Sequence, residues 1–364
     1  MRACDDCLRR TALLALLAPH VERARRDRRH LCALLSLSDD ALLAALGGSQ
    51  RSRLELAHES FDVEDVRARL SAARLQVVCR HDEHYPPQLL AASDAPAVLH
   101  VAGDPALLTA LSRDAAPAVA VVGARRAGPD GLEVARGLGR GLAAAGITVV
   151  SGMALGIDSA AHAGALEVAG PTVSVLAGGA DMPYPASKRS LYRALVQTQA
   201  VISEMPPGFR PFRWCFPARN RTIAALASVT IVVEATERSG SLITAELAQD
   251  LGRAVGAVPG PVTAPRYAGS NALLRDGALV IRHAQDALDE ALGIGVATAL
   301  GGRRADRLEP QLRALLERVE NGRDTVSALA ATPGEAQMAL AGLGELELLG
   351  FVRRGPGGRY VRLL

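Results

Sequence analysis

The chain has 364 residues, of which 49% are hydrophobic and 22% are charged, and this composition is typical of a globular protein with two or three domains. Its formal net charge is only +3, which excludes a strong global field, so a site for an anionic partner must be local. The absence of an uninterrupted apolar run of about 18 residues excludes a transmembrane helix, and the odd number of cysteines, five, predicts free thiols in a reducing cytoplasm.

Residues 1–78 are predicted to form an N-terminal helical domain of the SAM or helix-hairpin-helix type. The segment is rich in leucine and alanine, and Ser38 and Asp62 are typical residues for the start of a helix. The pair Gly47-Gly48 is a stop signal between them.

The same segment contains a candidate metal site. Cys4 and Cys7 have the C-x-x-C spacing of metal ligands, and His30 and Cys32 could complete a tetrahedral set. A single C-x-x-C pair is weak evidence, so we expect loosely placed free thiols and no bound metal.

The central segment, residues 79–292, is predicted to be a Rossmann-like α/β domain with a doubly wound, mainly parallel sheet. Short apolar runs rich in β-branched residues alternate with helical stretches, as buried parallel strands do. These apolar runs lie at 118–122, 147–150, 172–176, 200–203, 229–233 and 254–258. A further short strand is expected at 75–79, before the first of them.

The loops that follow these strands are rich in glycine, arginine and hydroxyl side chains. In a parallel sheet they all leave from the carboxyl edge, where open α/β sheets bind ligands. The first loop, at Gly123, lacks the dinucleotide fingerprint G-x-G-x-x-G, and no acidic residue closes the next strand. Arg125 is therefore interpreted as an anion contact, with a plain surface charge as the alternative.

Three further features carry two interpretations each. The aromatic residues of 209–216, interleaved with arginines, suit base stacking beside phosphate pairing, or they form a hydrophobic plug under a long loop. Ser239-Gly240-Ser241 precedes a helix and serves as a phosphate cradle or as an ordinary N-cap. His162 follows Asp158 by one helical turn, and we favour a packed histidine over a catalytic pair.

Residues 293–307 are predicted to be a linker, and residues 308–364 a winged-helix domain. The expected elements are helices at 310–319, 325–331 and 334–349, followed by a hairpin. Such a domain binds duplex DNA or another protein, and its arginines permit the first.

These features together resemble the DNA-processing protein A (DprA, Smf) family over residues 81–283. The matching pieces are collinear: Gly123-Ala-Arg125, SGMALGIDSAAHAGAL (151–166), YPASKRSLY (184–192), ISEMPPG (202–208), FPARNRTIA (216–224), VVEATERSGSLITA (232–245), AVPGPV (257–262) and GSNALLRDGA (269–278). One departure is Ala124, where the family usually has serine or threonine, so one phosphate hydrogen bond is expected to be missing.

The resemblance implies a protein that dimerises, binds single-stranded DNA without sequence preference, shields incoming DNA during natural transformation and loads the RecA recombinase onto it. It implies no catalytic residue and no cofactor, and single-strand-binding protein is a further candidate partner; no membrane partner is expected. The expected DNA contacts are Gly123, Arg125, Gly152, Phe216, Arg219, Asn220, Arg221, Ser239, Gly240, Ser241 and Asn271.

Two alternative functions compete with this one. A Rossmann-like phosphoribohydrolase of the lysine-decarboxylase-like type would use Glu246 at the end of SGSLITAE, but Thr236-Glu-Arg-Ser239 stands where its glycine-rich phosphate loop belongs. A purely structural adaptor acting through the winged helix would leave the arginines of the carboxyl edge unexplained.

Overall fold

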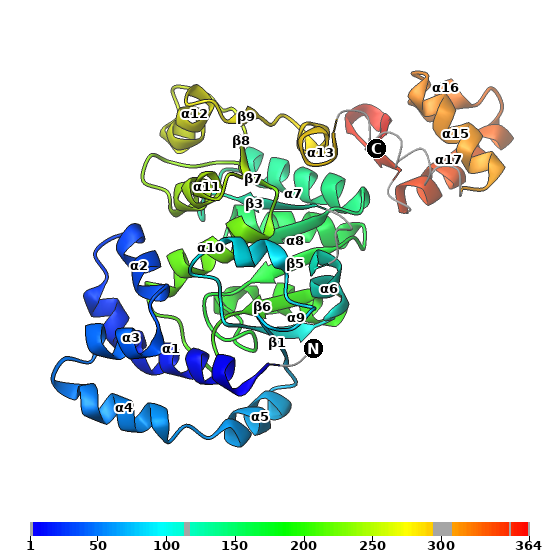
Figure 1. Ribbon diagram of the computed structural model, residues 1–364. Coiled ribbons are helices and arrows are strands. Elements are labelled where there is room, and N and C mark those ends of the chain that lie inside the picture. The colour runs from blue at the N-terminus through cyan, green and yellow to red at the C-terminus, as the bar shows by residue number, and fades with distance from the viewer. Residues whose placement is uncertain (1–2, 113–116, 294–307, 349–350, 363–364) are drawn as a thin grey trace.

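The computed structural model describes residues 3–112, 117–293, 308–348 and 351–362 (Figure 1). Its N-terminal part is helical, as predicted, and two predicted start signals are N-caps. Ser38 Oγ accepts a hydrogen bond from Ala41 N (3.3 Å), and Asp62 Oδ1 accepts one from Glu64 N (2.8 Å). The helices are α1 (Asp5–Ala24), α2 (Arg28–Leu35), α3 (Asp39–Leu46), α4 (Arg51–Glu59) and α5 (Val63–Ala72).

The central part is built on a nine-stranded sheet with the order β1-β2-β6-β5-β4-β3-β7-β8-β9. The strands are β1 (Gln76–Cys79), β2 (Val98–Gly103), β3 (Ala118–Val122), β4 (Thr148–Ser151), β5 (Thr172–Val175), β6 (Ala200–Ser203), β7 (Val229–Val232), β8 (Ala254–Ala257) and β9 (Leu279–Val280). From β6 to β9 all neighbours pair in parallel, whereas β1 and β2 are antiparallel additions at one edge. The doubly wound, mainly parallel sheet is confirmed, and each predicted strand is present. β2 and β9 were not predicted.

Helices cover both faces of this sheet because its central strands are apolar on both sides. On β3, Ala118, Ala120 and Val122 belong to the core under α10 (Cys215–Leu226) and α11 (Gly240–Asp250). Val119 and Val121 belong to the core under α7 (Pro129–Ala144), α8 (Ile157–Glu167) and α13 (Ala284–Leu292). The chain also forms α6 (Ala106–Ser112), α9 (Arg189–Thr198) and α12 (Ala268–Arg275).

The N-terminal helices share a core with the central part. Trp214, just before α10, is fully buried among residues of α1, α2 and α3, and its Nε1 donates a hydrogen bond to Ala18 O (3.0 Å). Its backbone N donates to Glu22 Oε2 (2.9 Å). The proposed domain boundary at residue 78 falls inside β1.

The C-terminal part contains the expected helices and strand pair. They are α15 (Pro310–Glu320), α16 (Val326–Leu329), α17 (Pro333–Leu348) and the antiparallel strands β10 (Val352–Arg354) and β11 (Tyr360–Arg362). The predicted linker at 293–307 lies outside the described residues except for Gly293. Within the described ranges no helix is long and apolar enough to cross a lipid bilayer.

Candidate nucleic-acid interface

A cavity of about 350 Å³ lies at the carboxyl ends of the central strands, between the starts of α10 and α11. A smaller hollow of about 80 Å³ adjoins it and shares Arg125, Phe216 and Arg219 with it. We call the two together the rim cavity. Most of the predicted contacts line it: Gly123, Arg125, Gly152, Phe216, Arg219, Asn220, Ser239, Gly240 and Ser241.

Close packing and backbone hydrogen bonds fix the loop after β3, and the Arg125 side chain at its surface is exposed to solvent. A Cβ on Gly123 would lie 2.7 Å from Ile157 Cγ1, so only glycine fits between β3 and α8. Ala124 N donates to Glu234 O (2.7 Å), and Ala124 O accepts from Ile157 N (3.2 Å). Both backbone groups of Ala124 are thus used in the fold, while the Arg125 side chain is left on the surface.

Arg125 lies beside a pair of aromatic rings. Its Cζ is 5.3 Å from the centroid of the Phe216 ring, within the range of a cation–π contact. The Tyr184 ring lies 5.4 Å from Phe216 at an interplanar angle of 53°, and Tyr184 is 47% exposed. A guanidinium and an accessible ring on one surface supply the two contacts that single-stranded nucleic acid needs: phosphate pairing and base stacking. Tyr184 was not among the predicted contacts, although it opens the matched segment YPASKRSLY.

The start of α11 forms another wall of the rim cavity. Ser239 is the N-cap, and its Oγ accepts from Ser241 N (3.4 Å) and lies 2.8 Å from Ser241 Oγ. Asn220 Nδ2 donates to Gly240 O (3.3 Å), which ties α10 to this turn. The N-cap interpretation is therefore confirmed, and the positive end of the helix dipole still faces the cavity, where it favours an anion.

Arg219 forms the buried floor of the cavity. Only 5% of it is exposed, and its Nη1 donates to Gly152 O and Val175 O, each at 2.6 Å, at the ends of β4 and β5. Burial lowers the pKa of Arg219 to about 10. Gly152 leaves room for this guanidinium, because a Cβ at position 152 would clash with Arg219 Nη1. Arg219 thus shapes the floor by satisfying carbonyls that strand ends would otherwise leave unpaired.

Two predicted contacts do not reach the cavity. Arg221 is 4% exposed and lies between two carboxylates, with Nη2 2.7 Å from Glu204 Oε2 and Nε 3.1 Å from Asp94 Oδ2. The amide of Asn271 pairs with Gly260, accepting from its N (3.2 Å) and donating to its O (3.0 Å). Arg221 is a structural ion-pair partner, and Asn271 fastens the loop after β8.

The aromatic segment 209–216 matches the hydrophobic-plug interpretation for three of its four rings. Trp214 is a core residue, and Phe209 and Phe212 pack against the N-terminal helices with ring centroids 6.1 Å apart. Phe216, which also contacts this core, is the member that lines the rim cavity.

The residues considered for catalysis do not form a reacting set. His162 Nδ1 lies 2.7 Å from Thr172 Oγ1, and burial lowers the pKa of His162 to about 3. Asp158 instead accepts hydrogen bonds from Gly152 N (3.1 Å) and Ala154 N (3.4 Å), and burial raises its pKa. Glu246 is exposed on α11 and does not line the rim cavity. The packed-histidine interpretation is confirmed.

The open sheet with helices on both faces places the chain in the doubly wound α/β class, in which ligands bind at the carboxyl edge where the rim cavity lies. Residues 76–292, more than half of the chain, match the family model of DNA recombination-mediator protein A. The chain belongs to this family, whose members include the proteins named DprA and Smf.

The similar proteins come from several bacterial groups. Protein Smf of Escherichia coli is 36% identical over 290 residues, which are 77% of this chain and 75% of that protein. The putative DNA processing protein DprA of Mycobacterium tuberculosis is 49% identical over 178 residues, which are 49% of this chain and only 46% of that protein.

Two solved structures share the fold. DprA from Streptococcus pneumoniae matches with a TM-score of 0.64 at 30% identity, covering 80% of this chain and 99% of that one. DprA from Helicobacter pylori matches with a TM-score of 0.53 at 30% identity, covering 59% of this chain and 94% of that one. The Helicobacter structure is described as giving insight into a single-stranded DNA binding mode.

Proposed function

We propose that the chain binds single-stranded DNA at the rim cavity without sequence preference. The observation that carries this proposal is the exposed Arg125 guanidinium over the Phe216 ring, with Tyr184 beside it. A guanidinium pairs with a phosphate of any nucleotide, and every base has a face that stacks on a ring. The start of α11 adds a second anion-binding element next to them. The binding described for the Helicobacter pylori protein supports the proposal.

The cavity suits holding a strand better than cutting it. Asp158 is the one carboxylate among the described residues that line it, and its Oδ2 accepts two backbone N–H groups. A pair of carboxylates for a divalent metal, or a nucleophile beside an oriented base, would be needed for hydrolysis. We therefore propose a binding protein without nucleotide cofactor, rather than a phosphoribohydrolase using Glu246.

The biological role that we propose rests on membership of the family. In this proposed role, a dimer of the chain shields incoming single strands during natural transformation and transfers them to RecA. Single-strand-binding protein is a further proposed partner. Residues 79–292 would hold the strand, and residues 308–364 would act as a winged-helix module. The strand pair β10–β11 after three helices supports the latter assignment.

Fluorescence anisotropy with labelled oligonucleotides tests the binding proposal. The full chain should bind single strands of different sequence with similar affinity, more tightly than a blunt duplex, and the affinity should fall steeply with salt. Equal affinity for the duplex, or binding indifferent to salt, would contradict it.

A strand-exchange assay tests the proposed role. Adding the chain to single strands coated with single-strand-binding protein should restore RecA filament formation, with ATP consumed by RecA alone. Hydrolysis of a nucleoside monophosphate by the chain at enzymatic rates would favour the competing enzyme.

A further inference from the structure

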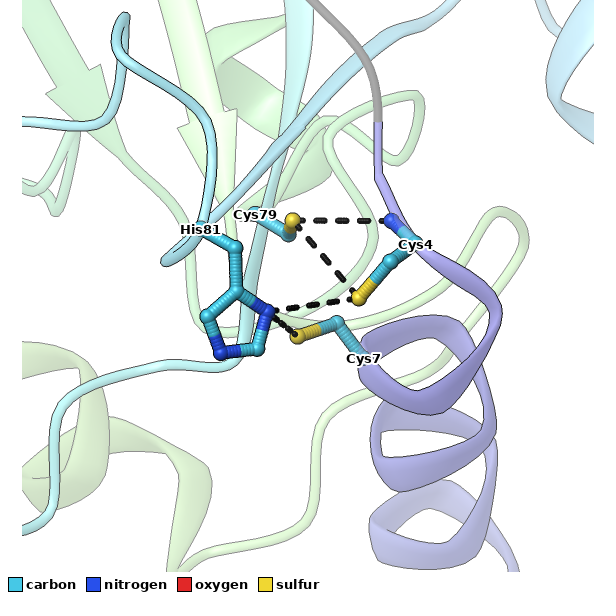
Figure 2. Close-up of side chains that lie close together, drawn as sticks. All are labelled: Cys4, Cys7, Cys79 and His81. Carbon is cyan, nitrogen blue, oxygen red and sulfur yellow. Dashed lines mark hydrogen bonds between the residues drawn. The ribbon is translucent and has the colours of Figure 1, made fainter.

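Four side chains from two distant segments converge where α1 meets the edge of the sheet (Figure 2). Cys4 is the N-cap of α1, and Cys7 lies in its first turn. Cys79 is the last residue of β1, and His81 lies in the turn that follows. Their three sulfurs and one ring nitrogen all lie within 4.8 Å of one another. The sequence thus contains a C-x-x-C pair and a C-x-H pair that the fold brings together.

The separations between these atoms are those of ligands around a single tetrahedral ion. Zinc bonds of about 2.3 Å to sulfur and about 2.0–2.1 Å to nitrogen place two sulfurs about 3.8 Å apart and a sulfur and a nitrogen about 3.6 Å apart. Cys79 Sγ lies 3.9 Å from Cys4 Sγ, and His81 Nδ1 lies 3.4 Å from Cys4 Sγ and 3.6 Å from Cys7 Sγ. Figure 2 shows the Nδ1 edge of the His81 ring turned toward both sulfurs.

The surroundings of the cluster also suit a structural metal site. Cys7 and Cys79 are buried, and Cys4 is half-buried, which shields the sulfurs from solvent. Cys4 N donates to Cys79 Sγ (3.5 Å), the type of backbone hydrogen bond that supports a thiolate ligand. His81 is exposed, which leaves the cluster open to an entering ion.

A disulfide and an iron–sulfur cluster both fit these four side chains less well than a single ion does. A disulfide requires a sulfur separation of about 2.05 Å, and a Cys4–Cys79 bridge would leave Cys7 and His81 without a reason to converge. An iron–sulfur cluster divides its ligands between different irons, and ligands on different irons stand further apart than the 4.8 Å within which all four ligand atoms lie here.

We infer that Cys4, Cys7, Cys79 and His81 bind one zinc ion in a closed, four-coordinate structural site. Four protein ligands leave no open position for a substrate, so the site serves the fold. Because its ligands come from α1 and from the end of β1, the ion fastens the N-terminal helices to the edge of the sheet. The expectation of loosely placed thiols is wrong for Cys4 and Cys7, whose sulfurs lie in this cluster, and His30 and Cys32 are not members of it.

Metal analysis of the full chain tests this inference directly. Protein purified under reducing conditions from zinc-supplemented cells should contain about one zinc ion per chain by mass spectrometry. Exchange with cobalt should give the intense d–d bands of tetrahedral coordination and a sulfur-to-cobalt charge-transfer band. Chelation should lower the melting temperature, and hydrogen exchange should then increase in α1 and β1; added zinc should reverse both changes, since metal binding is coupled to folding.

Variants separate the cluster from the remaining cysteines. Cys79→Ser and His81→Ala should lose most of the zinc, whereas Cys32→Ala should retain it. His81→Cys should still bind cobalt, with a stronger charge-transfer band from the added thiolate, which distinguishes ligand loss from misfolding. Reduced parent protein with zinc far below one ion per chain and without tetrahedral cobalt bands would overturn the inference. A Cys4–Cys79 disulfide as the native form, detected by mass spectrometry without reductant, would also overturn it.

Discussion

Arg125 and Arg221 carry the same guanidinium group, but the first is exposed to solvent and the second is buried. Arg125 is exposed at the end of β3 with a ring under its guanidinium, whereas Arg221 is buried between Glu204 and Asp94. The first keeps donors available to a phosphate, while the second has already used its charge in the fold. Burial and prior partners, rather than residue type, therefore decide which arginine of a basic segment can bind DNA.

The largest effect is expected on removing the buried arginine. Arg221→Ala leaves the carboxylates of Glu204 and Asp94 buried without a counter-charge, which should cost about 3–5 kcal/mol of unfolding free energy. Urea denaturation measures this loss, and Arg53→Ala, at an exposed position of α4, is the matched control. A loss below about 1 kcal/mol would mean that Arg221 is not the structural residue described above.

Removing the exposed Arg125 should weaken DNA binding while leaving the unfolding free energy almost unchanged. Arg125→Ala should weaken single-stranded DNA binding by about 1–3 kcal/mol because one phosphate contact is lost. Its unfolding free energy should stay within about 0.5 kcal/mol of the parent, as for other surface substitutions. Anisotropy titrations and urea denaturation of the same preparation test both parts. Parent-like binding by folded Arg125→Ala protein would remove this residue from the interface.

Loss of the Phe216 ring should weaken DNA binding somewhat less than loss of the Arg125 guanidinium. Phe216→Leu keeps an apolar side chain but removes the ring, and a loss of about 1–2 kcal/mol in binding is expected because Tyr184 remains available for stacking. Quenching of 2-aminopurine in the oligonucleotide should decrease in parallel. Unchanged affinity and quenching would place the bases elsewhere.

A smaller effect concerns pH and stability. Burial holds the pKa of His162 at about 3, so the folded protein keeps this ring neutral where the unfolded chain, with a pKa near 6.5, takes up a proton. Unfolding is therefore favoured as the pH falls below about 6.5, and between pH 6.5 and 5.5 this one group should cost about 1 kcal/mol. His162→Gln should lose less stability than the parent over that interval. Parallel stability curves for the two proteins would contradict the assignment.

The sequence predicted the sheet well because its central strands are short, β-branched and apolar on both faces. β2 was missed because it is an antiparallel strand that carries His100 and follows a proline-rich segment rather than a helix. The position of the rim cavity could also be predicted, since loops at the carboxyl ends of parallel strands meet at one edge.

Tertiary packing decided what the sequence left open. Nothing in FPARNR shows that Arg219 turns inward to strand-end carbonyls and Arg221 to two carboxylates, since their partners come from distant elements. The cysteine cluster is a similar case, because Cys7 and His81 are 74 residues apart along the chain. Spacing within one segment identified Cys4 and Cys7, but only the fold identifies their partners.

The salt dependence of Arg125→Ala tests the central claim most directly. Each phosphate contact to a single strand contributes about −0.7 to the slope of log K against log salt concentration, through counterion release. The account predicts that Arg125→Ala binds more weakly with a slope shallower by about 0.7, whereas Phe216→Leu binds more weakly with the parent slope. An unchanged slope for folded Arg125→Ala protein would show that its guanidinium does not contact a phosphate, and it would contradict the proposal that a strand binds over Arg125 at the rim cavity.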